Sequence, residues 1–242
     1  MQILSVLILV VCAALMHAQT VPDVQQARHL LVVTTPDWNS VDGTLTRYSR
    51  FNDKWKQVGD PIPVVVGKNG LAWDPQLANG DGDQFPGPVK HEGDGRAPAG
   101  IFKLGDSFGF VGSPSDIQNY LPLTPTTECV DDVNSKHYAQ IVDRSSIKDV
   151  DWSSSEKMRA IDLYRWGVVV RYNMSPSVPG NGSCIFLHIW RGPGQGTAGC
   201  TAMPETNLLD IIHWLNSKAP NAVLVQLPQS EYQRLKGKWS LP

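Results

Sequence analysis

The side chains best suited to covalent chemistry in this sequence are a thiol and an imidazole, Cys200 and His188. They are separated by a glycine-rich stretch, residues 191–199, which reads RGPGQGTAG. A neighbouring imidazole or a helix N-terminus lowers the pKa of a thiol and provides the thiolate that attacks an acyl group. The pair therefore predicts a cysteine nucleophile with a histidine base. The alternative is that both are ordinary core residues, a small buried thiol and a packed ring.

Gly199 directly precedes the candidate nucleophile. Because glycine has no Cβ, it allows backbone angles and close approaches that other residues disfavour. We expect the backbone amides of residues 199 and 200 to face a substrate carbonyl and to form an oxyanion hole.

A strand, a sharp loop and a helix N-terminus are the elements that must bring these groups together. Residues 184–190 (CIFLHIW) read as a strand, and a helix is expected over 204–215. The helix prediction rests on apolar residues at i, i+3, i+4 and i+7, after Pro204 near its start. Further strands are predicted from β-branched or alternating runs over 29–35, 44–51, 54–58, 61–67, 138–142, 166–172 and 221–227.

Loops and turns fill much of the remaining chain. Residues 68–96 are rich in Gly, Asp and Pro, and 79–83 (NGDGD) suggest either a solvated loop or, less consistently with the spacing, a calcium loop. The tail 233–238 is basic and is expected to be solvated. With no internal repeat or linker, the pattern favours one mainly β domain over residues 19–242, with one packed helix.

The N-terminus has the features of a secretory signal peptide, residues 1–18. An apolar run over 3–16 is too short to span a bilayer comfortably, and Ala18 gives a cleavage point before Gln19. A lipid anchor on Cys12 is not expected, because a lipoprotein signal would have a small residue at the position before it. We expect a mature protein without a membrane span, located in the periplasm or secreted.

Composition argues against several partners. The chain carries 21 Lys plus Arg and 23 Asp plus Glu, with no basic cluster. Nucleic acid and anionic membranes are therefore poor candidate partners. Three other histidines, His91, His137 and His213, have no metal-ligand spacing with Cys or Asp, so we expect neither metal nor cofactor.

Three cysteines remain after signal cleavage: Cys129, Cys184 and Cys200. An oxidising compartment allows two of them to pair, and the third is a candidate reactive thiol.

Two stretches carry a family pattern. The first joins IFLHIW (185–190) to TAGCTAMP (197–204), and the second, GDGRAPAGIF (93–102), is similar to Gly-(Lys/Arg)-(Thr/Ser)-Pro-x-Gly-x-(Phe/Tyr). In this order, they resemble the catalytic segments of the L,D-transpeptidase family of peptidoglycan cross-linking enzymes. The resemblance covers roughly residues 60–228 and implies an L,D-transpeptidase-like β-sandwich or barrel with one helix packed in its C-terminal half.

The resemblance also implies roles. Cys200 would attack the carbonyl between a diamino acid and D-Ala in a peptidoglycan stem peptide and form a thioester. His188 would take the thiol proton and later activate the acceptor amine, while the carbonyl of Thr197 holds the imidazole tautomer and Gly199 completes the turn. Transfer to an amine is L,D-transpeptidation, and transfer to water is L,D-carboxypeptidation; both remain open. The alternative from another class is a non-catalytic envelope-binding module.

Substrate contacts are less clearly indicated. The family usually has His at the position of Ala198 and Arg at that of Ala202. Arg191 is the candidate replacement cation, and Trp190 is a candidate for the groove wall. The protein is expected to act as a monomer.

If Cys200 is the free nucleophile that the resemblance implies, Cys129 and Cys184 form the disulfide. Such a bridge contributes roughly 4 kcal/mol in the loop-entropy model. It would place Asp132 and Tyr138 near the strand that carries His188, as candidate groove residues.

Overall fold

The computed structural model describes residues 24–78, 85–112, 114–216 and 221–242. The expected signal peptide and the 79–83 loop lie outside these residues. The strands are β1 His29–Thr35, β2 Asp42–Phe51, β3 Lys54–Val65, β4 Leu71–Trp73, β5 Ala97–Gly109, β6 Tyr120–Pro122, β7 Thr127–Val130, β8 Ile141–Asp143, β9 Ser155–Lys157, β10 Trp166–Val170, β11 Phe186–Ile189, β12 Thr201–Met203 and β13 Ala222–Pro228. The helices are α1 Pro75–Ala78, α2 Glu205–Leu215 and α3 Gln229–Leu235, with short 3-10 turns η1 Val24–Gln26, η2 Arg144–Ser146, η3 Met158–Ala160 and η4 Asp162–Tyr164.

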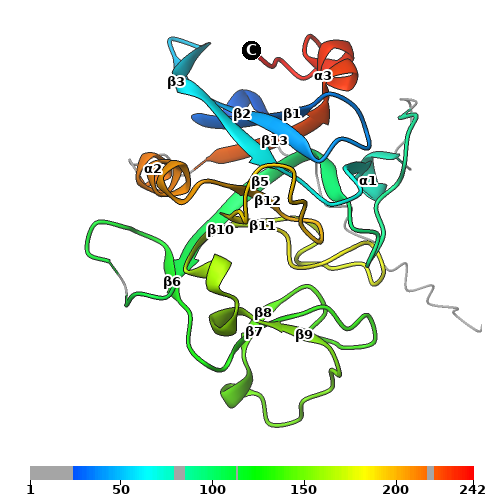
Figure 1. Cartoon of the computed structure of the whole chain (residues 1–242), viewed down its shortest axis with the longest axis vertical. Coiled ribbons are helices and arrows are strands. Elements are labelled where there is room, and N and C mark those ends of the chain that lie inside the picture. The colour runs from blue at the N-terminus through cyan, green and yellow to red at the C-terminus, as the bar shows by residue number, and fades with distance from the viewer. Residues whose placement is uncertain (1–23, 79–84, 113, 217–220) are drawn as a thin grey trace, which may run out of the picture.

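A 10-stranded sheet forms the larger part of the molecule. Its order is β10-β11-β12-β3-β2-β1-β13-β5-β4, with β6 beside β5, and β10 also pairs with β5. That last pairing closes the sheet into a barrel (Figure 1). The mainly β fold predicted from the sequence is therefore confirmed.

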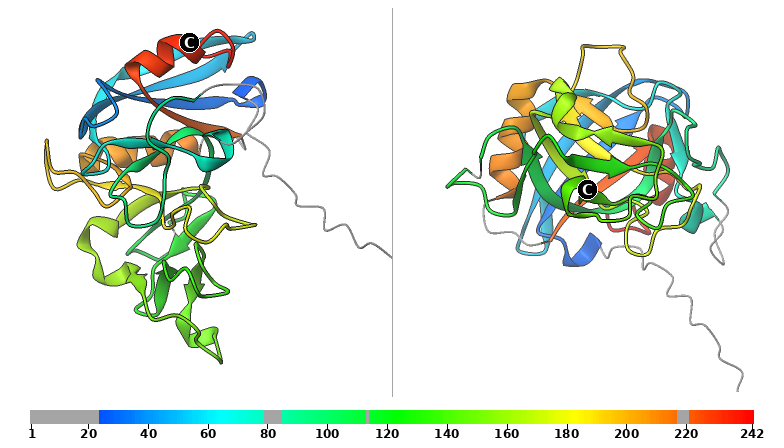
Figure 2. Two further views of the ribbon diagram at one scale, coloured as in Figure 1. Left: turned by 90° about the vertical axis from the view of Figure 1, so that its right-hand side faces the viewer. Right: turned by 90° about the horizontal axis from the view of Figure 1, so that it is seen from below.

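A second, 3-stranded sheet of order β8-β7-β9 lies below the barrel in Figure 1 and in the left view of Figure 2. A hydrophobic cluster joins the two parts. It contains Phe108 of β5 and Phe186 of β11 from the barrel, and Cys129, Met158 and Tyr164 from the smaller part. The single-domain organisation remains a prediction, and this shared cluster is consistent with it.

The strand β11 separates two environments because its side chains alternate. Ile185, Leu187 and Ile189 join the main core of the barrel. Phe186 and His188 point to the other face, where Phe186 belongs to the cluster shared with the small sheet. The candidate base thus lies at the junction of the two parts.

The predicted helix is confirmed as α2, which buries Leu208, Ile211 and Ile212. It packs against β10 and β11, the strand of the candidate base.

One local expectation was wrong. The run 138–142 is a strand only from Ile141, because Ala139 has a φ of 60°, which is not an extended conformation. The basic tail 233–238 is exposed, as expected, except for Leu235. Leu235 lies on α3 one turn after the buried Tyr232, and this helix packs against β13 and β1.

Candidate active site

Cys200 and His188 lie on neighbouring parallel strands. In the register of β11 and β12, Leu187 pairs with Thr201 and His188 with Ala202. Cys200, directly before β12, is therefore level with Phe186, whose amide donates a hydrogen bond to Sγ at 3.3 Å. The thiol in turn donates to the carbonyl of Cys184 at 3.4 Å. Strand pairing, rather than the intervening loop, fixes the position of the thiol.

The Cys200 thiol is protonated in this arrangement. Only 5% of the residue is exposed, and it is the one free cysteine of the described chain. Burial, and secondly the negative charge of Glu156, raise the pKa of the thiol to about 12, against the opposing effect of the Phe186 amide. Formation of a thiolate at neutral pH therefore requires a group that accepts its proton.

His188 is a neutral ring with a defined tautomer. Its Nδ1 lies 2.7 Å from the carbonyl oxygen of Ile189. A carbonyl only accepts hydrogen bonds, so Nδ1 carries the proton and Nε2 keeps its lone pair. Burial lowers the pKa of the imidazole to about 4, and the positive charge of Arg191 adds to this effect. The ring is thus set up as a base at Nε2.

Thr197 shapes the turn before the nucleophile. Its hydroxyl donates to the carbonyl of Cys200 at 2.6 Å and accepts from the amide of Gly199 at 3.1 Å. Its own carbonyl accepts from the amide of Lys68 at 2.8 Å. The contact that was expected from the Thr197 carbonyl, which fixes the imidazole tautomer, is instead made by the carbonyl of Ile189, the residue after His188 on β11.

Gly199 also differs from expectation. Its backbone is not in the left-handed region, and its amide is already bound to Thr197 Oγ1, so that amide does not face an oxyanion. The lack of a Cβ serves packing instead. A Cβ there would lie 3.1 Å from the carbonyl oxygen of Arg96 and 3.3 Å from Ile185.

Tyr164 and Glu156 are two residues that the sequence did not indicate. The Tyr164 ring lies edge-on to His188, with centroids 5.2 Å apart, and its hydroxyl donates to Oε2 of Glu156 at 2.8 Å. The same residue is close enough to Cys200 to influence the pKa of the thiol. Among the hydrogen bonds of the described residues, none joins Cys200 to His188. The tyrosine is their common neighbour.

The carboxyl group of Glu156 lies in an environment that disfavours its charged form. Burial of its carboxyl group raises its pKa to about 7, opposed by the hydrogen bond from Tyr164 and reinforced by the nearby charges of Asp131 and Glu92. In the sequence it lies in the polar run 153–157 (SSSEK), which is typical of a solvated segment, so no local signal marked it.

The disulfide prediction is confirmed: Cys129 and Cys184 are bonded, with Cα atoms 6.0 Å apart. Cys129 on β7 pairs in register with Glu156 on β9. Cys184 is the residue whose carbonyl accepts from the Cys200 thiol. The bridge therefore ties the strand pair that carries Glu156 directly to the backbone around the nucleophile.

The predicted substrate residues fall in two groups. Tyr138 is buried and donates to Glu92 at 2.6 Å, while Asp132 accepts hydrogen bonds from Asn134 and Ser153 in a turn. Both are engaged in internal contacts, and neither contacts Cys200 among the described residues.

Trp190 and Arg191 directly follow the strand of His188. Trp190 is partly exposed, and its amide donates to the carbonyl of Met203 on β12 at 2.9 Å. Arg191 is exposed and close enough to His188 to influence its pKa. Ala202, at the family's Arg position, is fully buried and opposite His188. Arg191 thus remains the candidate cation.

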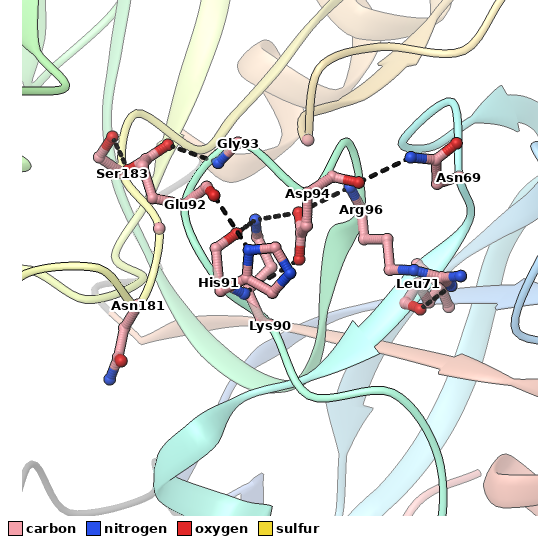
Figure 3. A network of polar contacts seen from close by, with 12 residues as sticks. Asn69, Leu71, Lys90, His91, Glu92, Gly93, Asp94, Arg96, Asn181 and Ser183 are labelled. Carbon is pink, nitrogen blue, oxygen red and sulfur yellow. Dashed lines mark hydrogen bonds and ion pairs between the residues drawn. The ribbon is translucent and has the colours of Figure 1, made fainter.

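The second motif begins in a polar loop, residues 90–96, whose contacts are drawn in Figure 3. Lys90 and Asp94 form an ion pair at 2.6 Å, with 3% and 4% of their side chains exposed. Asp94 also accepts from the amide of Arg96, whose guanidinium donates to the carbonyls of Leu71 and Trp38. The positive charge of Lys90 slightly lowers the pKa of the Cys200 thiol. This motif therefore supports the site structurally.

Within the described ranges, no group of His, Cys, Asp or Glu side chains is arranged to hold a metal ion. The described helices include none that is long and apolar enough to span a membrane.

The chain matches the YkuD family, the L,D-transpeptidase catalytic domain, over residues 39–225. A comparison with curated proteins found no match. Two solved structures are similar to it, the helical cell shape determining protein Pgp2 from Campylobacter jejuni and a mutant of that protein, each with a TM-score of 0.41 and 14% identity. The matches cover 82% and 83% of this chain but 46% and 47% of those chains, so the chain spans about half their length.

Proposed function

The chain belongs to the YkuD family of L,D-transpeptidase catalytic domains, and from this membership we propose that it is a cysteine acyltransferase that cross-links peptidoglycan stem peptides. The observation that carries the proposal is the placement of Cys200. It is a free thiol at the start of β12, beside the strand of a neutral histidine, in the segment that the family match includes.

The proposed reaction has two halves. His188 takes the thiol proton of Cys200 at Nε2, and the thiolate attacks the carbonyl between the diamino acid and D-Ala of a stem peptide. The histidine returns that proton to the departing amine, so D-Ala leaves and a thioester remains. In the second half, an amine of another stem peptide attacks the thioester. His188 takes the proton of that amine at Nε2, while its Nδ1 stays bound to Ile189. Neither half requires a cofactor.

The second half also defines the nearest alternative. If water replaces the amine, the same acyl-enzyme gives an L,D-carboxypeptidase. The two activities share Cys200 and His188 and differ in the acceptor, so their products distinguish them.

We further propose that the protein acts outside the cytoplasm as a monomer. The Cys129–Cys184 disulfide supports this location, because such bonds form and persist in oxidising compartments.

The test uses residues 19–242 and the Cys200→Ala variant, each incubated with tetrapeptide muropeptides and followed by mass spectrometry. The expected result is D-Ala release with cross-linked dimers for the wild type and no product for the variant. Tripeptides without dimers would assign the carboxypeptidase instead. Equal product from both proteins, or no product from either, would contradict catalysis by Cys200 and favour a binding module.

A further inference from the structure

The carbonyl of Cys184 accepts the hydrogen bond of the Cys200 thiol, so the groups that hold this carbonyl also orient the nucleophile. We propose that Glu92 is a positioning residue of the site, which holds the Cys184 carbonyl on the thiol through Ser183 and Tyr138. The inference rests on the proposed role of Cys200 as nucleophile. Among the hydrogen bonds of the described residues, none joins Glu92 to the thiol directly, so its effect is exerted through its neighbours.

The sulfur of Cys200 is held by two backbone groups of one segment. Its S–H donates to the carbonyl of Cys184 at 3.4 Å, and Sγ accepts from the amide of Phe186 at 3.3 Å. Ile185, which lies between them, uses its own carbonyl to accept from the amide of Val170 on β10. Backbone groups of an extended chain alternate in direction, so those of Cys184 and Phe186 both face Cys200. The direction of the Cys184 carbonyl therefore determines where the thiol points.

The conformation of Cys184 needs support from its surroundings. Its φ is 54°, in the left-handed region that residues other than glycine rarely adopt. A residue in such a conformation persists where the surrounding structure fixes it. The disulfide to Cys129 holds its side chain, whereas its backbone follows directly from the residues before it. Contacts made by those residues therefore help to set the direction of the carbonyl.

Glu92 holds the two residues directly before Cys184. Its Oε2 accepts from the hydroxyl of Ser183 at 2.7 Å and from the hydroxyl of Tyr138 at 2.6 Å. The Tyr138 oxygen in turn accepts from the amide of Gly182 at 3.0 Å. One carboxylate oxygen thus fixes Ser183 directly and Gly182 through a tyrosine.

Glu92 is itself fixed within the polar loop, where Figure 3 shows it facing Ser183. Its amide donates to the carbonyl of Gly180 at 2.8 Å, and its Oε1 accepts from the amide of Gly93 at 3.2 Å. The two hydroxyl groups that it binds belong to buried residues, since 1% of Tyr138 and 8% of Ser183 is exposed. Because one oxygen accepts from both, loss of the Glu92 side chain removes both supports at once.

A fixed Cys184 carbonyl has two effects on the nucleophile. It keeps Sγ of Cys200 in one orientation, and a hydrogen bond donated by a thiol favours its protonated form. The thiol therefore stays neutral and oriented until His188 takes its proton. Without the carbonyl contact the side chain can rotate, which lowers the fraction of molecules that are aligned for attack.

The first test records the infrared S–H stretching band of residues 19–242 with the disulfide intact. Cys200 is then the single thiol, so the band reports its hydrogen bond alone. A thiol that donates a hydrogen bond absorbs at lower frequency than a free thiol. In Glu92→Ala and in Ser183→Ala we expect the band to move to the frequency of a free thiol. Glu92→Gln keeps an oxygen that can accept from both hydroxyl groups and should leave the band in place.

The second measurement is the release of D-Ala by the same variants. If the thiol is aligned less often while the groups that bind the peptide are unchanged, kcat falls and KM stays the same. We expect kcat of Glu92→Ala to fall about tenfold or more. Glu92→Gln should retain most of the wild-type kcat, because its amide oxygen restores the contacts with Ser183 and Tyr138.

The matched control is Ser155→Ala. The hydroxyl of Ser155 also donates to a carboxylate at 2.7 Å, that of Glu128, but it lies on β9 in the small sheet. Its loss should leave the S–H band and kcat unchanged. Near-ultraviolet circular dichroism checks that each variant is folded. Ser183→Ala removes a single oxygen and provides the reading if Glu92→Ala fails to fold.

Three results would overturn the proposal. The first is an S–H band that keeps its wild-type frequency in Glu92→Ala and Ser183→Ala. The second is an equal shift in Ser155→Ala, which would trace the change to lost stability. The third is a shift in Glu92→Gln as large as that in Glu92→Ala, which would trace it to charge. The band is recorded without peptidoglycan, so its outcome is distinct from that of the muropeptide test.

Discussion

Nδ1 of His188 lies 2.7 Å from the carbonyl oxygen of Ile189, the next residue along β11. A strand therefore supplies both the base and the group that fixes its tautomer. The carbonyl that the family resemblance suggested, that of Thr197, is bound to the amide of Lys68 instead.

The buried, neutral state of His188 predicts a pH dependence of stability. Burial lowers its pKa from 6.5 to about 4. Between these values the unfolded chain binds a proton that the folded protein does not, so the free energy of unfolding falls as pH falls from about 6.5 to 4. The loss amounts to about 3 kcal/mol. Urea unfolding of wild type and His188→Gln at pH 7 and pH 4 measures it, and the variant should lack this component.

Comparison of the two proteins is necessary because other groups titrate in the same range. Glu156 and Asp74 have raised pKa values, of about 7 and about 6, which oppose the histidine effect. Their contributions cancel in the difference between wild type and variant. Identical pH dependences for both proteins would contradict the buried, neutral histidine.

The hydroxyl of Thr197 should matter more than its size. Thr197→Val keeps the shape but loses the hydrogen bonds to Cys200 and Gly199. We expect a loss of about 1 to 3 kcal/mol in unfolding free energy and slower D-Ala release, because the turn before the nucleophile is no longer held. Thr197→Ser retains the hydroxyl and should remain close to wild type in both assays; equal defects in the two variants would refute this role.

The buried pair of Lys90 and Asp94 should behave as a coupled unit. Asp94→Asn leaves an ammonium group buried without its partner, which costs about 3 to 5 kcal/mol. The double variant Lys90→Met with Asp94→Asn should recover much of that loss, because no unpaired charge remains. Denaturant unfolding of the single and double variants gives the coupling energy between the two side chains. If the losses of the two single variants simply add up in the double variant, the pair is not coupled.

Loss of the disulfide should affect both stability and the thiol. Replacement of Cys129 and Cys184 by alanine is expected to lower the free energy of unfolding by roughly 4 kcal/mol in the loop-entropy model. It should also speed the alkylation of Cys200 by iodoacetamide, followed by mass spectrometry, because Cys184, whose carbonyl accepts from the thiol, is then no longer tethered to β7. The unaltered protein treated with a reductant is the companion measurement. An unchanged alkylation rate would show that packing alone keeps the thiol buried.

The sequence was most informative where a signal is local. The alternation in β11, the helical spacing of Leu208, Ile211 and Ile212, and the odd number of cysteines each lie within a short stretch or a count. These features led to the fold class and the helix, and the disulfide followed from the cysteine count once the family resemblance implied that Cys200 is free.

What the sequence missed depends on contacts between distant segments. Glu156, Tyr164 and Cys200 come together only when the small sheet docks on the barrel. Nothing near Glu156 distinguishes it from a solvated glutamate. The occupied amide of Gly199 likewise depends on the rotamer of Thr197, which residue spacing does not specify.

The parallel pairing of β11 with β12 has a consequence for how this site tolerates change. Because the register of two strands fixes Cys200 and His188, the exposed part of the crossover between them, residues 191–195, does not determine their separation. Added residues in such a loop cost little free energy, since closure entropy grows slowly with length. A shift of one residue within β12, in contrast, would turn every side chain of that strand to the opposite face. The crossover is thus the segment in which insertions can reshape the approach to the thiol while the thiol itself stays in place.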